Sequence, residues 1–299
     1  MHYRGSLASR LAVTTGLLWA GTGHAQAWLP DGGETSFGVS YSDTFDTQHV
    51  DSHGNKGDFG HMRVYTYGFG AAYSPTDSIM LSAVLPLISS EYHGANPHRT
   101  TVDDGSYHTT FTDLRTEAHY QLSMEPVAVA PYIAYVLPTH DYETLGHAAP
   151  GRGLHETWLG VAVGMSLDKW VPRTFVQSRF TYAIVEKVAG ISHDKENIEF
   201  NVGYYLTPDV SAQAYVNWQK TLGGIDLPIP PSNPLYAHHD QLGATDFTNV
   251  GVAGSWNYSD HSTLTFGYSE GISGRNGHLL GRAISIAYNY GFFGFRPHR

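Results

Sequence analysis

Apolar and polar side chains alternate along most of the chain with a period of two. In residues 79–87, every odd position from Ile79 to Leu87 is apolar. In residues 209–219, the even positions are apolar or small, whereas the odd positions are mostly polar. Because successive side chains of a β-strand point to opposite faces, this alternation predicts strands with one apolar and one polar face.

Twelve segments of this kind, rich in Tyr, Val, Phe and Thr, follow one another from residue 34 onward, and none has convincing helical spacing. They cover about residues 34–44, 61–73, 77–90, 108–122, 126–138, 154–167, 173–186, 196–207, 209–222, 245–258, 262–272 and 279–293. Turn residues separate them, so the sequence predicts an all-β fold.

Two kinds of connection alternate between these segments. Five are tight, at residues 74–78, 123–126, 167–172, 207–209 and 259–261. Six others are mostly longer, at residues 45–60, 91–107, 139–153, 187–195, 223–244 and 273–278. Outer-membrane barrels have an even number of strands, short periplasmic turns and longer outer loops. The sequence therefore predicts a twelve-stranded antiparallel up-and-down transmembrane β-barrel with both termini in the periplasm.

A soluble β-sandwich would alternate in the same way, and it is the alternative interpretation, together with a secreted barrel. Its solvent-facing side should be rich in Lys and Glu, but only 15% of the residues are charged, against about 25% in an ordinary soluble domain. The polar faces carry mainly Ser, Thr, Asn, Gln and small residues, as a narrow wet lumen would. Many apolar faces end in aromatic residues, which is typical of the girdles at the two membrane interfaces. Composition therefore favours the membrane barrel.

Residues 1–27 have the pattern of a signal peptide. Arg4 and Arg10 form its positive flank, residues 11–20 form a short apolar run, and Ala25-Gln26-Ala27 is a small-x-small cleavage pattern. The run is too short for a transmembrane helix, which needs about 20 apolar residues. We therefore expect export across the inner membrane and a barrel of residues 28–299 in the outer membrane of a Gram-negative bacterium.

Charge and cysteine content narrow the partners. Cleavage would remove two arginines and no acidic residue, so the net charge of −10 would become −12; a nucleic-acid partner, which requires a basic face, is excluded. The absence of cysteine excludes disulfides, thiolate metal sites and a lipoprotein anchor. The last segment ends in Phe293, which resembles the signal read by the barrel-assembly machinery, although residues 294–299 follow it. The expected partners are outer-membrane lipid, a small-molecule solute and that machinery.

Twelve strands lie between the eight that side chains can fill and the sixteen to eighteen of open porins, so we expect a narrow bore. Glu117 and Arg179 each lie about six residues from a tight turn, which predicts similar depth in the barrel. The candidates for a charged lumen band are Asp113, Arg115, Glu117, Arg179 and Glu199. Such a band could be a constriction that orients a polar or weakly charged solute. The alternative, which we favour, is an ion-pair network that braces the barrel wall.

Histidine is unusually frequent, with 18 residues, and most lie in the predicted outer loops or at their rim. They are His49, His53, His61, His93, His98, His108, His140, His147, His155, His193, His238, His239 and His278. One hypothesis is capture of a divalent metal at the mouth, with His238-His239-Asp240 as the densest cluster. The other is a set of solvated histidines that share no site. The sequence itself defines no metal site and no cofactor.

No enzyme is expected from this sequence. The chain contains no Gly-x-Ser-x-Gly nucleophile elbow. Glycine-rich pieces such as residues 68–70 lie within predicted strands, so they are not phosphate-binding loops followed by a helix.

Several short motifs resemble a known family. Phe111-Thr-Asp-Leu-Arg115 leads into Ala118-His-Tyr120 after Val84-Leu-Pro-Leu87, and Gly151-Arg-Gly153 precedes Trp158-Leu-Gly160. In these motifs the chain resembles the outer-membrane proteins associated with the meta-pathway of phenol degradation. The resemblance implies a transporter-like barrel for hydrophobic or aromatic solutes. We thus expect a channel for passive diffusion of a small solute; the alternative is a surface binding barrel whose His-rich loops contact divalent metal or a secreted partner.

Overall fold

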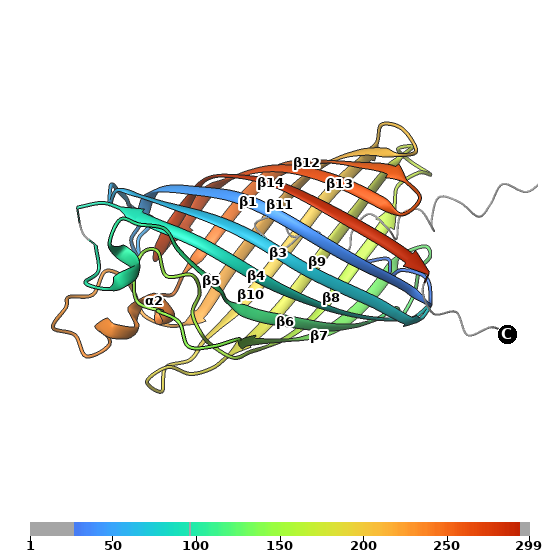
Figure 1. The fold of residues 1–299 in the computed structure, drawn as a ribbon. Helices are drawn as coiled ribbons and strands as arrows, with labels where there is room; N and C mark the ends of the chain where they lie inside the picture. Colours follow the sequence, from blue (N-terminus) through green and yellow to red (C-terminus); the bar gives the residue numbers. More distant parts are fainter. Residues whose placement is uncertain (1–26, 96, 294–299) are drawn as a thin grey trace, which may run out of the picture.

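A computed structural model describes residues 27–95 and 97–293, so the predicted signal peptide lies outside the described residues except for Ala27. One antiparallel sheet makes up the fold and closes on itself, because β14 pairs with both β13 and β1. Figure 1 shows the resulting barrel with its strongly tilted strands. The strands are β1 (Glu34–Val50), β2 (Lys56–Gly57), β3 (His61–Thr76), β4 (Ile79–His93), β5 (His108–Phe111), β6 (Asp113–Tyr120), β7 (Ala128–Pro138), β8 (Glu156–Ser166), β9 (Thr174–Val185), β10 (His193–Tyr205), β11 (Val210–Gly223), β12 (Asp246–Ser259), β13 (Ser262–Arg275) and β14 (Gly277–Phe293).

The predicted twelve-stranded barrel is confirmed over the described residues. β2 only pairs with the end of β1, and β5 and β6 together form the predicted segment 108–122. That strand is interrupted at Thr112, whose N–H donates to the carbonyl of Pro86 over 3.0 Å. Proline has no N–H to give to a ladder and is usually found at strand edges or irregularities. The missing N–H of Pro86 therefore explains why the strand opposite it is interrupted at Thr112.

Some loop boundaries differ from the prediction. The sequence predicts a loop at residues 45–50, but these residues continue β1, which pairs with β14 as far as Val50. Residues 193–195 begin β10, and the expected loop 273–278 is a tight hairpin in which Asn276 has a φ of 55°. Most residues at these strand ends are polar, so alternation gives no clear signal there, whereas the neighbouring strands still supply the hydrogen bonds.

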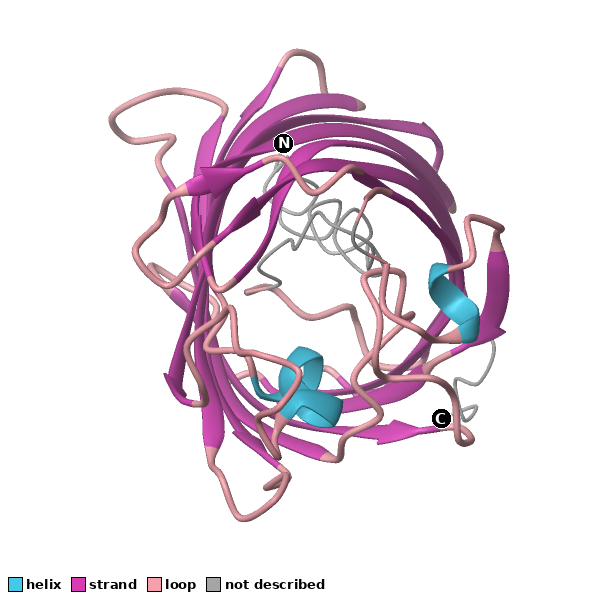
Figure 2. Cartoon of the chain, turned by 90° about the vertical axis from the view of Figure 1, so that its left-hand side faces the viewer, coloured by secondary structure: helices cyan, strands magenta, loops and turns pink. Residues whose placement is uncertain are grey.

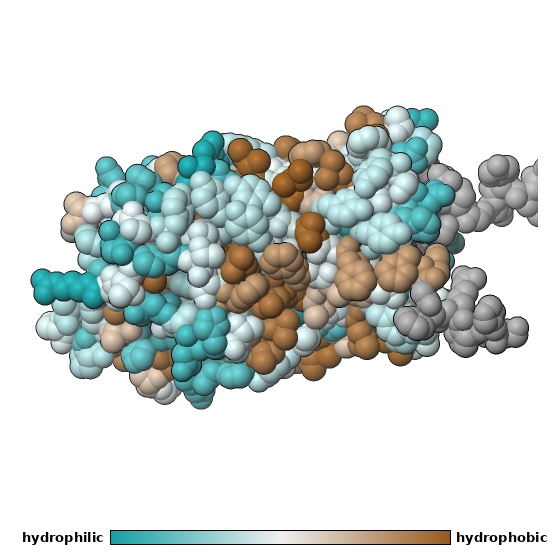
Figure 3. Space-filling model, viewed as in Figure 1, coloured by the Kyte–Doolittle hydropathy of each residue, from teal (hydrophilic) through white to brown (hydrophobic). Residues whose placement is uncertain are grey.

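Side chains alternate between the lumen and the outside of the barrel. On β11, the side chains of Ser211, Gln213 and Tyr215 point inward and are buried. Val216, which follows Tyr215, points outward and is exposed. Outward residues of other strands are also apolar and exposed, for example Val252 at 57% and Phe266 at 54%. Figure 3 shows such residues gathered around the middle of the barrel, with hydrophilic residues concentrated toward the loop end. An apolar surface of this extent is unusual on a soluble monomer and matches the lipid-facing band of a membrane barrel.

The two ends of the barrel differ. Short turns join the strands at one end, and most of the connections at the other end are longer loops. These loops carry the short helical turns η2 (Thr101–Asp103), η3 (Tyr236–His238) and α2 (His239–Leu242). Seen from the loop end, several loops fold inward across the opening (Figure 2). No helix in the described part of the chain is long and apolar enough to cross a membrane.

The segment that precedes β1 lies inside the barrel at the turn end. Ala27, Trp28 and Leu29 are buried in an apolar cluster with inward residues of several strands, among them alanines of β7 and β8. Two glutamines hold the segment: Gln177 accepts from the Ala27 N–H at 3.1 Å, and Gln121 accepts from the Leu29 N–H at 2.8 Å. A side chain at Gly164 would come within 2.7 Å of the Trp28 ring. Small inward residues therefore make room for Trp28, and the segment narrows this end of the lumen.

Candidate functional site in the barrel lumen

Charged side chains meet inside the barrel where β6 and β9 present their odd-numbered residues to the lumen. Arg115 and Glu117 on β6 and Arg179 on β9 are all buried. Their even-numbered neighbours, such as Thr116 and Phe180, are exposed on the outside. Strand alternation therefore places the three charges on the inner surface.

Glu117 is the centre of this group. Its Oε1 lies 2.9 Å from Arg115 Nε and 3.0 Å from Arg179 Nη2, and its Oε2 lies 2.7 Å from His119 Nε2. A single carboxylate thus faces two guanidinium groups and an imidazole. Buried charges are tolerated when groups of opposite charge compensate them in this way. We call Arg115, Glu117, His119 and Arg179 the lumen charge cluster.

Aromatic rings surround the lumen charge cluster. Arg179 donates from Nε to the hydroxyl of Tyr132 at 2.8 Å, and its guanidinium carbon lies 4.1 Å from the centre of that ring. The Tyr132 hydroxyl also contacts Thr181. His119 stacks on Tyr132 with ring centres 4.9 Å apart, and Arg115 lies 5.1 Å from the Trp158 ring centre. These cation–π and stacking contacts fix the guanidinium planes.

The other two predicted residues occupy different positions. Glu199 on β10 is directly opposite Arg179 in the strand register, so it faces the lumen beside the cluster. Asp113 is not part of the cluster: the hydroxyl of Tyr142, from the loop after β7, donates to it. The Gly153 N–H donates to that same hydroxyl at 2.8 Å. Asp113 therefore anchors an outer loop to the barrel wall.

A second charged group, nearer the outer loops, was not predicted. Glu156 Oε1 lies 2.8 Å from Arg152 Nη2 and 2.9 Å from Lys195 Nζ, and its Oε2 accepts from Trp158 Nε1 at 2.7 Å. Glu156 and Lys195 stand near the outer ends of β8 and β10, where the sequence suggested a loop around residue 195. Continuing the alternation of β10 back by four residues from Glu199 would have placed Lys195 on the inner face.

The lumen therefore combines charge of both signs with aromatic faces. It offers guanidinium donors, carboxylate acceptors and the partly exposed Trp158 ring within one short stretch of wall. Such a surface can hydrogen-bond a polar group while it stacks on an unsaturated ring. Because both signs are present, it does not form the single-sign ring that selects strongly for one ion type.

Comparisons with known proteins identify the fold. The chain is similar to an outer-membrane channel of Pseudomonas putida F1 described as the COG4313 outer membrane channel, with a TM-score of 0.69 and 15% identity over 88% of this chain and 97% of that one. It is also similar to the β domain of the Bordetella autotransporter BrkA, with a TM-score of 0.50 and 9% identity over 87% of this chain and 99% of that one. No family model and no curated protein matches the chain. The chain thus has the fold of outer-membrane barrels.

Proposed function

We propose that this protein is an outer-membrane channel through which a small solute diffuses passively. The exposed apolar band around a closed barrel supports a location in the membrane. The observation that carries the channel proposal is the inner surface, where buried charged and polar side chains line the wall in place of a dry apolar core. The proposed diffusion follows the concentration gradient of the solute and uses no energy coupling.

The solute that fits this lumen is small and carries both a ring and a polar group. Trp158, which is partly exposed on the inner face of β8, supplies an aromatic ring, and Arg115 and Glu117 supply a donor and an acceptor beside it. The segment with Trp28 narrows the turn end, which disfavours large solutes. Phenols and aromatic carboxylates have this chemistry, and they agree with the aromatic solutes that the sequence resemblance implies.

Liposome swelling tests the proposal with a panel of solutes. Proteoliposomes with the purified barrel should swell faster in benzoate or 4-hydroxybenzoate, which are ionised and cross a bare bilayer slowly, than in a disaccharide of equal osmolality, since the bore is narrow. The variant Trp158→Leu, which removes the partly exposed ring beside Arg115, should reduce the preference for aromatic solutes. Thr265→Ala, at a buried position of β13, is the matched control and should not. Swelling no faster than in protein-free liposomes for every solute would refute the channel.

A further inference from the structure

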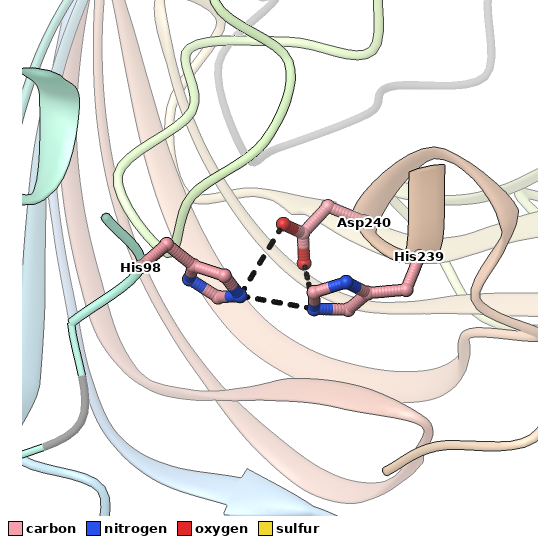
Figure 4. Close-up of side chains that lie close together, drawn as sticks. All are labelled: His98, His239 and Asp240. Atoms are coloured by element: carbon pink, nitrogen blue, oxygen red, sulfur yellow. Dashed lines mark hydrogen bonds and ion pairs between the residues drawn. The ribbon is translucent and has the colours of Figure 1, made fainter. Parts of the chain in front are cut away.

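Outside the lumen, the outer loops bring together side chains that are far apart in the sequence. His98 lies in the loop after β4, and His239 and Asp240 lie in α2 in the loop after β11. The Nε2 atoms of the two imidazoles are 3.0 Å apart. Asp240 Oδ1 lies 3.4 Å from His239 Nε2, and Asp240 Oδ2 lies 3.9 Å from His98 Nε2. Figure 4 shows the three side chains converging on one point.

The hydrogen bonds at the other ring nitrogens determine which nitrogens carry protons. His98 Nδ1 lies 3.0 Å from Asp103 Oδ2, and His239 Nδ1 lies 2.6 Å from the carbonyl oxygen of Tyr236. A carboxylate and a carbonyl only accept, so each Nδ1 must be the protonated nitrogen. In their neutral forms, both rings then present a bare Nε2 lone pair to each other. Two lone pairs at this distance repel unless a cation, either a proton or a metal ion, lies between them.

We propose that His98, His239 and Asp240 bind a divalent transition-metal ion of the zinc class. Two imidazole nitrogens and a carboxylate oxygen are a common ligand set for zinc. Tetrahedral zinc with bonds of about 2.0–2.1 Å would separate two ligand nitrogens by about 3.3 Å, close to the spacing of the two Nε2 atoms. These ligand atoms all lie within 4.8 Å of one another. Three protein ligands leave a position for water.

The surroundings of the ligands fit this assignment. Metal-binding histidines usually donate their second N–H to a carboxylate or a backbone carbonyl, which orients the ring, and both histidines do so here. Asp103 is itself held by the backbone N–H groups of His98, His147 and Ala148, at 2.9, 3.1 and 2.9 Å. These bonds hold the Asp103 carboxylate in place, and the carboxylate in turn orients the His98 ring.

The site joins three outer loops over the mouth of the barrel. Asp240 Oδ2 accepts from the Gly146 N–H at 2.9 Å, which connects the loop after β7 to the two loops that carry the metal ligands. A bound ion would add bonds between loops that otherwise meet through hydrogen bonds and ring contacts. The metal thus holds the loops in the inward arrangement seen in Figure 2.

Isothermal titration with ZnCl₂ tests the site on the purified barrel in detergent at pH 7.5. We expect one saturable equivalent for the wild type and at least tenfold weaker binding for His98→Ala and His239→Ala. His238→Ala and His140→Ala are matched controls, because each removes a loop histidine outside the ligand set, and they should bind as the wild type does. Loss of heat-modifiable gel mobility would identify a variant that had failed to fold.

Cobalt provides an independent readout that needs no variant. Co²⁺ bound by the wild type should give the intense visible absorption of a four-coordinate site, and added Zn²⁺ should abolish it. No saturable zinc uptake would show that only a proton bridges the two imidazoles and would overturn the proposal. Equal affinity in the wild type and a His98→Ala/His239→Ala variant would overturn it too, because binding would then lie elsewhere among the loop histidines.

Discussion

Glu117 on β6 and Arg179 on β9 form an ion pair of 3.0 Å although β7 and β8 stand between their strands. The two side chains therefore meet inside the lumen, across the part of the wall that β7 and β8 form. The pair fills part of the bore with charge, and Glu117 is the carboxylate that both Arg115 and Arg179 contact. Changing Glu117 should therefore alter how ions pass.

The variant Glu117→Gln should shift the selectivity of the channel toward anions. It removes one negative charge and leaves Arg115 and Arg179 in place. A unit charge at 4 Å contributes about 1 kcal/mol in water, which corresponds to about a fivefold change in permeability ratio. The reversal potential in a salt gradient across a planar bilayer measures this ratio. Glu143→Gln, an equal charge change in an exposed outer loop, is the control; identical reversal potentials for both variants would place Glu117 outside the conducting path.

Trp28 should limit conductance at the turn end. Trp28→Ala removes the large ring from the apolar cluster inside the barrel, and Ala cannot fill the space, so single-channel conductance should rise. Trp170→Ala should leave conductance unchanged, because Trp170 is 68% exposed in a turn between strands. If conductance did not rise in Trp28→Ala, the segment before β1 would not lie in the path.

Val252 should face lipid near the middle of β12. Val252→Arg is expected to destabilise the barrel by about 2–4 kcal/mol in a bilayer, the cost measured for arginine on the lipid face at the midplane. Urea titration of folding into vesicles measures this free energy. Asp260→Arg, in the turn between β12 and β13, should cost far less. Equal costs for the two variants would argue against the membrane position of the apolar band.

Asp103 should make the outer loops sensitive to acid. Its pKa is raised by burial, but hydrogen bonds from His98 and from the backbone N–H groups of Ala148, His98 and His147 outweigh this and lower it to about 2 from 3.8. The folded-state pKa is depressed, so the stabilisation, about 2 kcal/mol, is present above pH 3.8. It is lost as the pH falls toward 2.

Hydrogen exchange of residues 97–107 and 146–149 at pH 5 and pH 2.5 checks this. Wild-type protection should fall at the lower pH after correction for intrinsic exchange, whereas Asp103→Asn should show low protection at both.

The stability contribution of His98 has the opposite dependence on pH. Burial lowers its pKa, but the hydrogen bond to Asp103 and the charge of Asp240 outweigh this and leave it raised, so its contribution is present below pH 6.5 and decreases at higher pH. Unchanged protection at pH 2.5 would contradict the role of Asp103.

The sequence predicts the barrel well because alternation is a local property that each strand shows independently. The grouping of Glu117 with Arg179 was also predictable, since distance from a tight turn sets depth in a barrel. The role of Asp113 was not predictable, because it depends on a hydrogen bond from Tyr142, which only the folded loop brings close. In the sequence, Trp28 belongs to a short linker before the first strand. The residues next to it in the sequence do not show that small residues elsewhere, such as Gly164, leave room for its ring.

The contact between His98 and His239 was beyond sequence reasoning for a similar reason. The two residues are separated by 141 positions and meet only because two loops fold over the same opening. The sequence favoured His238-His239-Asp240 because these residues are adjacent. In the structure, His238 bonds Gln241 instead, and His98 takes its place beside His239.

Single-channel recording in a planar bilayer tests the central claim most directly. The folded protein, inserted from detergent, should give discrete and reproducible conductance steps smaller than those of a sixteen-stranded porin measured in the same salt. A bilayer that stays silent while the protein in it is shown to be folded by its heat-modifiable mobility would contradict a conducting lumen. The protein would then be a barrel that only displays its outer loops.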